Sequence, residues 1–161
     1  MNGSGRPRPV RARRAALAAL CAWLLPAGAA AAPTCQFLVA NALAFGTYDP
    51  LAAAPLDSSS QLQYKCPGAQ PVRISIDAGQ SGTFSARELQ SGSERLLYQV
   101  YLDAQRQIVW GDGSGGSSVG PLVTSAGAQG STTAWLFGRI FARQDVAAGA
   151  YADTLRVTLE L

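Results

Sequence analysis

The last residues of the chain alternate strictly between apolar and polar side chains. In the segment from Thr154 to Leu161, every second residue is apolar, starting at Leu155, and the residues between them are polar or charged. A period of two is the pattern of a β-strand that buries one face. The chain therefore contains a sheet with a covered face. Its final strand either lies at the edge of a finished sheet or borders a gap that another chain must fill.

The rest of the sequence after residue 33 indicates further short strands, with almost no helical periodicity. An apolar segment from Gln36 to Phe45 comes first, and a turn is expected at Asp77-Ala78-Gly79. Strands are expected over 61–66, 72–76, 96–102, 107–110 and 132–142 and after Gly149, with loops over 49–60 and 111–120. The second loop is so rich in glycine that we expect it to be mobile. Many short strands with Gly- and Pro-bearing turns are typical of a β-sandwich.

The first 32 residues have the pattern of a secretory signal peptide. Five arginines between residues 6 and 14 precede an apolar run from Ala15 to Leu25, and the alanines Ala29 to Ala32 stand before the expected cleavage site. A charged start, a short apolar run and small residues define such a peptide, and the run is short for a transmembrane helix. The pair Arg13-Arg14 leaves twin-arginine export open. We expect a signal peptide over 1–32, a sandwich domain over 33–161, and export to the periplasm and then the cell surface or medium.

The charge of the expected domain argues against nucleic-acid binding. The whole chain has 13 basic and 10 acidic residues, a net charge of +3. Five of the basic residues belong to the expected signal peptide, which leaves eight against ten and a net charge of −2. A nucleic-acid-binding domain is expected to be basic, so we expect no such partner.

Two cysteines remain once the signal peptide is removed, Cys35 and Cys66. In an oxidising compartment two cysteines are expected to pair, although two separate buried thiols remain an alternative. The bond would tie the first strand to the second as a structural link. On the chain-entropy view it would stabilise the fold by roughly 3–4 kcal/mol.

The sequence offers little for catalysis. It has no histidine, which excludes Ser–His–Asp and Cys–His arrangements. Two paired cysteines and scattered carboxylates make a poor zinc site, and the surroundings of Asp112 match neither a P-loop nor an EF-hand. A carboxylate pair could in principle hydrolyse a glycoside, but most acids fall in expected turns or on polar strand faces. We expect no enzyme, no metal and no cofactor.

Four aromatic residues allow a different reading. Trp110, Trp135, Tyr98 and Tyr101 could stack on sugar rings in a lectin-like site. The same residues could instead pack in the core or across neighbouring strands of a sandwich, and this second interpretation is favoured.

Several motifs together resemble the spore coat protein U domain family, which includes the pilins of archaic chaperone–usher pili. The resemblance covers essentially the whole chain after residue 33 and rests on their order. The motifs are Cys35 and Cys66, LAFGTYDP from Leu43, ISIDAG from Ile74, LLYQVYLD from Leu96, WGDG from Trp110, FGRIFARQ from Phe137 and the ending GAYADTLRVTLEL.

The resemblance implies an immunoglobulin-like sandwich that lacks its last strand and has a hydrophobic groove in its place. In such pilins a periplasmic chaperone fills the groove, and the N-terminal extension of a neighbouring pilin subunit later replaces it, with exchange catalysed by an outer-membrane usher. Carried onto this chain, the groove would be bordered by the opening segment and the final strand. The expected border residues are Phe37, Val39, Leu43, Phe45, Leu155, Val157, Leu159 and Leu161.

One departure from the family concerns the start of the exported chain. Cleavage near Ala32 would leave only Pro33 and Thr34 before Cys35, whereas a polymerising pilin carries its donor strand there. We therefore expect a subunit of a surface pilus, involved in adhesion and biofilm formation, that accepts a strand but does not donate one. It would occupy a fibre tip or a minor position, although tip adhesins of this system tend to have two domains. The alternatives are a stand-alone secreted coat or matrix protein and a carbohydrate-binding module, each with a complete sandwich and an unknown ligand.

Overall fold

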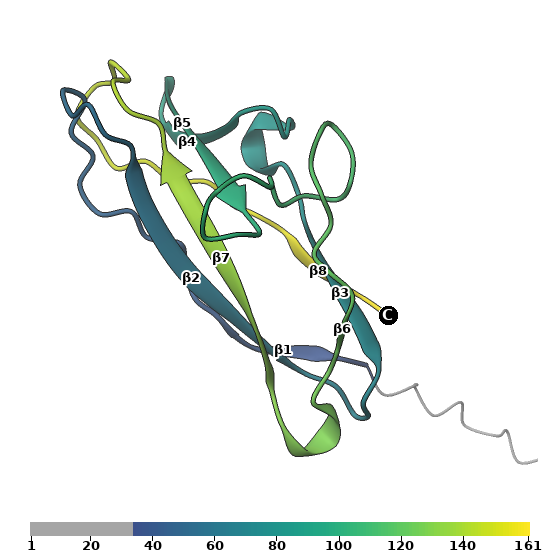
Figure 1. Ribbon diagram of the computed structural model, residues 1–161. Coiled ribbons are helices and arrows are strands. Elements are labelled where there is room, and N and C mark those ends of the chain that lie inside the picture. Colours follow the sequence, from purple (N-terminus) through teal and green to yellow (C-terminus); the bar gives the residue numbers. More distant parts are fainter. Residues whose placement is uncertain (1–33) are drawn as a thin grey trace, which may run out of the picture. The chain divides into compact units, whose positions relative to one another are not determined.

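The structure is a computed structural model that describes residues 34–161, so the predicted signal peptide lies outside the described residues. Within that range no helix is long and apolar enough to cross a membrane. The elements follow one another as β1 (Gln36–Ala40), β2 (Leu56–Lys65), β3 (Pro71–Ile76), η1 (Gly79–Ser81), β4 (Arg87–Ser91), β5 (Glu94–Tyr101), β6 (Val123–Thr124), η2 (Gly127–Gln129), β7 (Thr132–Ile140) and β8 (Val157–Glu160) (Figure 1).

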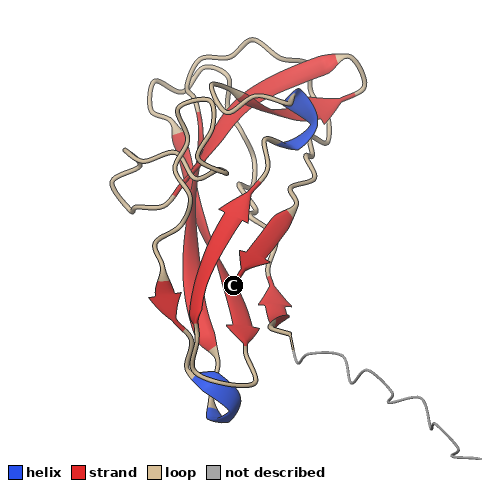
Figure 2. Ribbon diagram, turned by 90° about the vertical axis from the view of Figure 1, so that its right-hand side faces the viewer, coloured by secondary structure: helices blue, strands red, loops and turns tan. Residues whose placement is uncertain are grey.

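The strands form two antiparallel sheets, which confirms the predicted all-β sandwich. One sheet has five strands in the order β1-β2-β7-β5-β4, and the other has three in the order β6-β3-β8. The helical content of the described residues is confined to the short 3₁₀ turns η1 and η2 (Figure 2). The final strand is β8, and its partner in the sheet is β3.

The core lies between the two sheets and follows the alternation of the strands. Buried side chains on the inner faces come from both sheets: Leu62, Tyr64, Cys66, Val72, Ile74, Ile76, Leu96, Tyr98, Val100, Trp110, Leu136 and Ile140. Each large apolar side chain that is fully buried stabilises the fold by roughly 1.5–3 kcal/mol. The period of two in β3, which the sequence shows directly, is therefore the period of the core.

The loop predicted over 49–60 is wrong in its second half, because β2 begins at Leu56. Residues 56–60 pair with β7 although they are mostly polar. Inward-facing Ser60 can be accommodated because its hydroxyl donates to the Asn41 carbonyl oxygen, 2.8 Å away. Outward-facing Asp57 accepts two hydrogen bonds from Arg139, at 2.7 and 2.9 Å. Local composition indicated a loop, but partners distant in sequence make the segment a strand.

The brief strand predicted over 107–110 is also wrong, because these residues form no continuous pairing with a neighbouring strand. The structure has single bridges there instead, Tyr101 to Val109 and Trp110 to Ser118. The glycine-rich loop that follows is held by backbone hydrogen bonds, among them Gly111 N to the Ser118 oxygen at 2.8 Å. Its predicted mobility stays a prediction, and the short strands β4 and β6 were not predicted at all.

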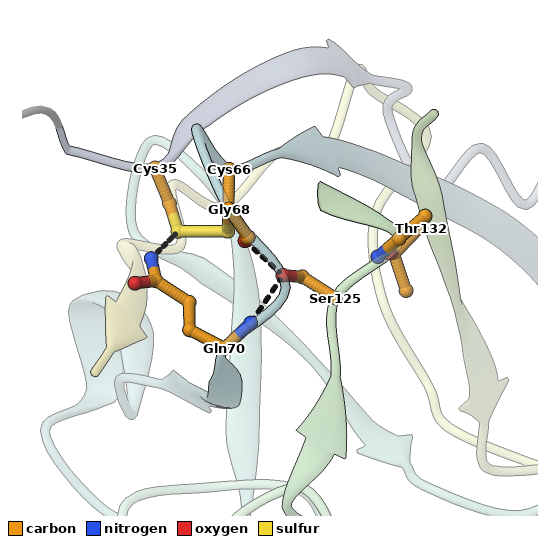
Figure 3. The surroundings of a disulfide bond; sticks show 7 residues. Cys35, Cys66, Gly68, Gln70, Ser125 and Thr132 are labelled. Carbon is orange, nitrogen blue, oxygen red and sulfur yellow. Dashed lines mark hydrogen bonds between the residues drawn. A yellow bond between two sulfur atoms is a disulfide. The ribbon is translucent and has the colours of Figure 1, made fainter. Parts of the chain in front are cut away.

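The predicted disulfide between Cys35 and Cys66 is confirmed (Figure 3). It joins the residue before β1 to the residue after β2. Gln70 donates from its side-chain amide to Cys35 Sγ at 2.9 Å and from its backbone N–H to Ser125 Oγ at 3.1 Å. The Ser125 hydroxyl in turn donates to the Gly68 carbonyl oxygen at 3.0 Å. The disulfide is therefore part of a hydrogen-bonded cluster that links the first strand to both strands of the β3–β6 pair.

Replacing both cysteines, in a Cys35→Ala/Cys66→Ala variant, should lower the free energy of unfolding by about 3–4 kcal/mol, because the unfolded chain regains the freedom that a 31-residue separation had restricted. Urea unfolding of the exported protein measures this. A reductant should destabilise the parent protein and leave the double variant unchanged. Equal unfolding midpoints of parent and variant would contradict the prediction.

Candidate functional site

An open apolar groove of about 940 Å³ lies along the inner face of the five-stranded sheet. Its floor consists of buried and half-buried side chains of β2, β4, β5 and β7: Leu62, Leu89, Leu96, Tyr98, Leu136 and Ile140. Residues 40–48 form one side, which we call the first wall, and lining residues between 146 and 157 form the other, which we call the second wall. We refer to the whole as the apolar groove.

The first wall is the irregular segment that follows β1. Leu43 and Phe45 pack against the core, and the Phe45 ring meets the Tyr98 ring edge-on with centroids 6.0 Å apart. This approach depends on the small residue Gly138 of β7, since a Cβ there would lie 2.5 Å from Leu43 Cδ2 and 2.7 Å from Phe45 Cζ and would displace these side chains. The Asn41 N–H donates to the Gln61 carbonyl oxygen at 3.3 Å and fixes the start of the wall.

The second wall leads into β8. Its half-buried residues alternate with exposed ones from Tyr151 onward, and Leu155 and Val157 line the groove while Thr154 and Arg156 do not. Before Tyr151 the wall has only small side chains, because residues 147–150 are alanine and glycine. Backbone hydrogen bonds between Ala152 and Gln90 of β4, at 2.8 and 3.1 Å, hold this part in place.

Two strand edges without a partner meet the groove. In the sheets formed by residues 34–161, β1 pairs only with β2 and β8 pairs only with β3. The groove is lined by Ala40 at the end of β1 and by Val157 at the start of β8. The free edges supply backbone donors and acceptors, and the half-buried apolar side chains of the two walls supply apolar surface. An added extended segment could use both.

A single charged side chain lines the apolar groove, that of Asp153. The Tyr98 hydroxyl donates to Asp153 Oδ2 at 2.7 Å. Burial, and then this hydrogen bond to the carboxylate, raise the pKa of Tyr98 well above its usual value. Nearby Arg87 is fully buried, and its guanidinium donates to the Asp77 and Trp110 carbonyl oxygens, each at 2.7 Å. Burial lowers the pKa of Arg87.

The eight predicted border residues divide into three groups. Leu43, Phe45, Leu155 and Val157 line the apolar groove. Two more, Phe37 and Leu159, are half-buried against the core, and Val39 is half-buried. The last, Leu161, lies beyond β8 with 68% of its surface exposed. The small residues of the second wall were missed, because an alanine–glycine run before a strand has the composition of an ordinary turn.

The four aromatic residues considered for sugar stacking are not brought together on a surface. Trp110, Tyr98 and Tyr101 are buried, and the Trp110 indole N–H donates to the Ile74 carbonyl oxygen at 2.9 Å. The exposed one is Trp135, at 54%. Three of the four therefore serve the core, as the favoured interpretation held. Within the described part of the chain, no group of three His, Cys, Asp or Glu residues could hold a metal ion.

A Gly138→Ala substitution should loosen the first wall, because its methyl group overlaps Leu43 and Phe45. We expect the free energy of unfolding to fall by about 1–3 kcal/mol, the usual cost of overpacking. Gly68→Ala is the matched control, since a Cβ there meets nothing within 4 Å. Urea unfolding of both variants tests the assignment, and an equally small effect of the two changes would refute it.

The raised pKa of Tyr98 predicts a loss of stability in alkali. Above about pH 10 the unfolded chain releases the tyrosine proton while the folded protein retains it, so unfolding is favoured as pH rises. The free energy of unfolding should fall by up to about 1.4 kcal/mol for each pH unit from this residue. Urea unfolding between pH 8 and pH 11 should show a shallower decline for Tyr98→Phe than for the parent. Parallel declines would contradict the prediction.

Comparison with known proteins places this fold. Among solved structures, the chain is similar to one in the crystal structure of the CsuC–CsuE chaperone–tip adhesion subunit pre-assembly complex from archaic chaperone-usher Csu pili of Acinetobacter baumannii, with 22% identity and a TM-score of 0.54 over 81% of this chain. The present chain spans 40% of that chain's length, and at this identity the likeness shows the fold alone. No curated protein matches. The family model for the Spore Coat Protein U domain matches residues 22–158, and the chain therefore belongs to the Spore Coat Protein U domain family.

Proposed function

We propose that the protein is a subunit of a chaperone–usher pilus and that its apolar groove accepts an extended strand from another chain. The observation that carries this proposal is the groove itself, an apolar floor between two free strand edges. Family membership and the fold shared with a tip subunit that forms a complex with a chaperone support it. We propose a structural role for this protein and no catalytic one.

The energetics of the groove favour an occupant. Leu43, Phe45, Leu155 and Val157 are only half-buried on its walls. Burying a large apolar side chain completely gains roughly 1.5–3 kcal/mol, compared with a total stability of about 5–15 kcal/mol for a typical domain. A strand that covers these four residues would therefore raise the stability of the domain substantially. An open edge of this kind is otherwise a site of aggregation.

Membership of the Spore Coat Protein U domain family suggests which partners would use the groove. We propose that a periplasmic chaperone fills the apolar groove after export, and that a neighbouring pilin subunit replaces it at the outer-membrane usher. The assembled fibre would act at the cell surface in adhesion and biofilm formation. The expectation that this chain donates no strand of its own concerns residues ahead of Cys35, outside the described part of the chain, and stays a prediction.

Periplasmic expression with and without a co-expressed pilus chaperone tests the proposal. We expect recovery as a one-to-one complex in the first case, and in the second a protein of low stability whose urea midpoint rises when a donor-strand peptide is added. A stable monomer that binds neither the chaperone nor the peptide would contradict the proposal and favour a stand-alone coat protein.

A matched pair of variants localises the binding. Val157→Thr places a hydroxyl on the second wall with little change in shape, and burying that hydroxyl without a partner should weaken peptide binding roughly tenfold. Thr158→Ser changes the next residue of β8, which is exposed. Its affinity for the peptide should match that of the parent. Equal weakening by both substitutions would place the binding site elsewhere.

A further inference from the structure

The second wall presents an inward row of side chains that is apolar with one exception. Alternate residues from Tyr151 to Leu159 are half-buried, and the second member of this row is Asp153. Leu155 and Val157 follow at spacings of two residues, and all three line the apolar groove. An acid therefore occupies a fixed position in an otherwise apolar row, two residues before the next apolar side chain, Leu155.

The carboxylate of Asp153 is held in place but is not saturated. Its Oδ1 accepts the backbone N–H of Gln80 at 3.0 Å and of Thr154 at 2.7 Å. Its Oδ2 accepts the Tyr98 hydroxyl at 2.7 Å. A carboxylate has about four acceptor positions, so three hydrogen bonds leave one position on Oδ2 without a donor. The carboxylate also packs closely against Gly79, where an added Cβ would overlap Oδ2, so its position is fixed.

No cation in the described residues forms an ion pair with Asp153. Arg87 is close enough to interact with it through its charge. The guanidinium of Arg87 is fully buried, however, and donates to the Asp77 carbonyl oxygen, the Trp110 carbonyl oxygen and the Gln99 side chain. Arg87 therefore supplies no hydrogen bond to the carboxylate.

We infer that the apolar groove selects an extended strand whose inward side chains are apolar beside Val157 and Leu155 and basic, a lysine or arginine, beside Asp153. This inference rests on the proposed function and adds the register of the bound strand. An apolar side chain beside Asp153 would remove water from the carboxylate without replacing its hydrogen bond, which costs free energy. A basic side chain restores both the hydrogen bond and the charge balance.

The same acid fixes the register of the incoming strand. A shift by one residue turns every side chain of a strand to its other face, and a shift by two moves the basic residue to an apolar part of the wall. A groove with only Val157 and Leu155 would tolerate the shift by two residues, because an apolar side chain of the strand would then still meet an apolar residue of the wall. Asp153 distinguishes the two registers, so it is a specificity-determining residue of the groove.

Blocked synthetic peptides of alternating valine and threonine test this inference with the full exported protein, refolded in their presence. In each peptide, the inward-facing residue nearest one end is lysine, glutamine, methionine or glutamate. Each of the four peptides is made in two versions, with this residue near the N-terminus or near the C-terminus, so that both parallel and antiparallel binding are tested. We expect the lysine peptide to bind about three- to fivefold more tightly than the glutamine peptide, and glutamate to bind most weakly. The preference should shrink at about 0.5 M salt, where charges are screened over a few ångströms.

Asp153→Asn should abolish the lysine preference while the uncharged peptides still bind. The asparagine oxygen can accept from Gln80 and Thr154, and its amide can donate to the Tyr98 hydroxyl, so the wall keeps its shape. Asp145→Asn is the matched control, because Asp145 is exposed and does not line the groove. The control should retain the full preference for lysine.

Each outcome separates the inference from the proposed function. If no peptide binds the parent protein, the strand-acceptor function itself fails. If all peptides bind equally, or if Asp153→Asn retains the lysine preference, the groove accepts strands but Asp153 does not set their register. Preferential binding of the lysine peptide that is lost in Asp153→Asn and kept in Asp145→Asn establishes the inference.

Discussion

The unequal width of the two sheets determines the rest of this structure. Five strands present an inner face that only three strands cover. The part of that face along the groove carries buried apolar residues of β5 and β7, including Leu96, Leu136 and Ile140. Two irregular segments line the same groove, residues 40–48 and residues 146–157. Their apolar side chains are only half-buried, so the cover that this chain supplies is incomplete there.

Each irregular wall has backbone groups that are hydrogen-bonded to other parts of the fold. In the first wall, the Asn41 carbonyl oxygen accepts the Ser60 hydroxyl at 2.8 Å. In the second, the Arg156 N–H donates to Asp77 Oδ1 at 2.9 Å, and its carbonyl oxygen accepts the Asp77 N–H at 3.0 Å. These bonds attach the first wall to β2 and the second wall to the residue that follows β3. Ser60, one of the polar residues that make Leu56–Ser60 resemble a loop, thus anchors the first wall.

Periodic features could be predicted from the sequence, and long-range polar contacts could not. The alternation in Val72–Ile76 and in the final segment gave the strands and the buried face, and two cysteines gave the disulfide. The first wall was expected from Leu43 and Phe45 through the resemblance. The role of Arg87 was not predictable, because a lone arginine near a strand carries no sign that three distant carbonyl or amide oxygens will surround it. The small residues of the second wall could not be predicted for the same reason. They line the groove only because the fold brings them beside residues that are distant in the sequence.

A single acid in the groove also clarifies how an open apolar groove can be specific. Apolar contacts scale with the area buried and depend little on which residue supplies it, so an apolar groove alone would accept many strands in several registers. A charge that must find a partner penalises every register that leaves it unpaired, and specificity arises from that penalty more than from added affinity. The Tyr98 hydroxyl and the backbone N–H groups of Gln80 and Thr154 hold Asp153 where it can impose the penalty. The lining residues thus divide the task, since the apolar side chains of both walls supply affinity and the acid of the second wall sets the register.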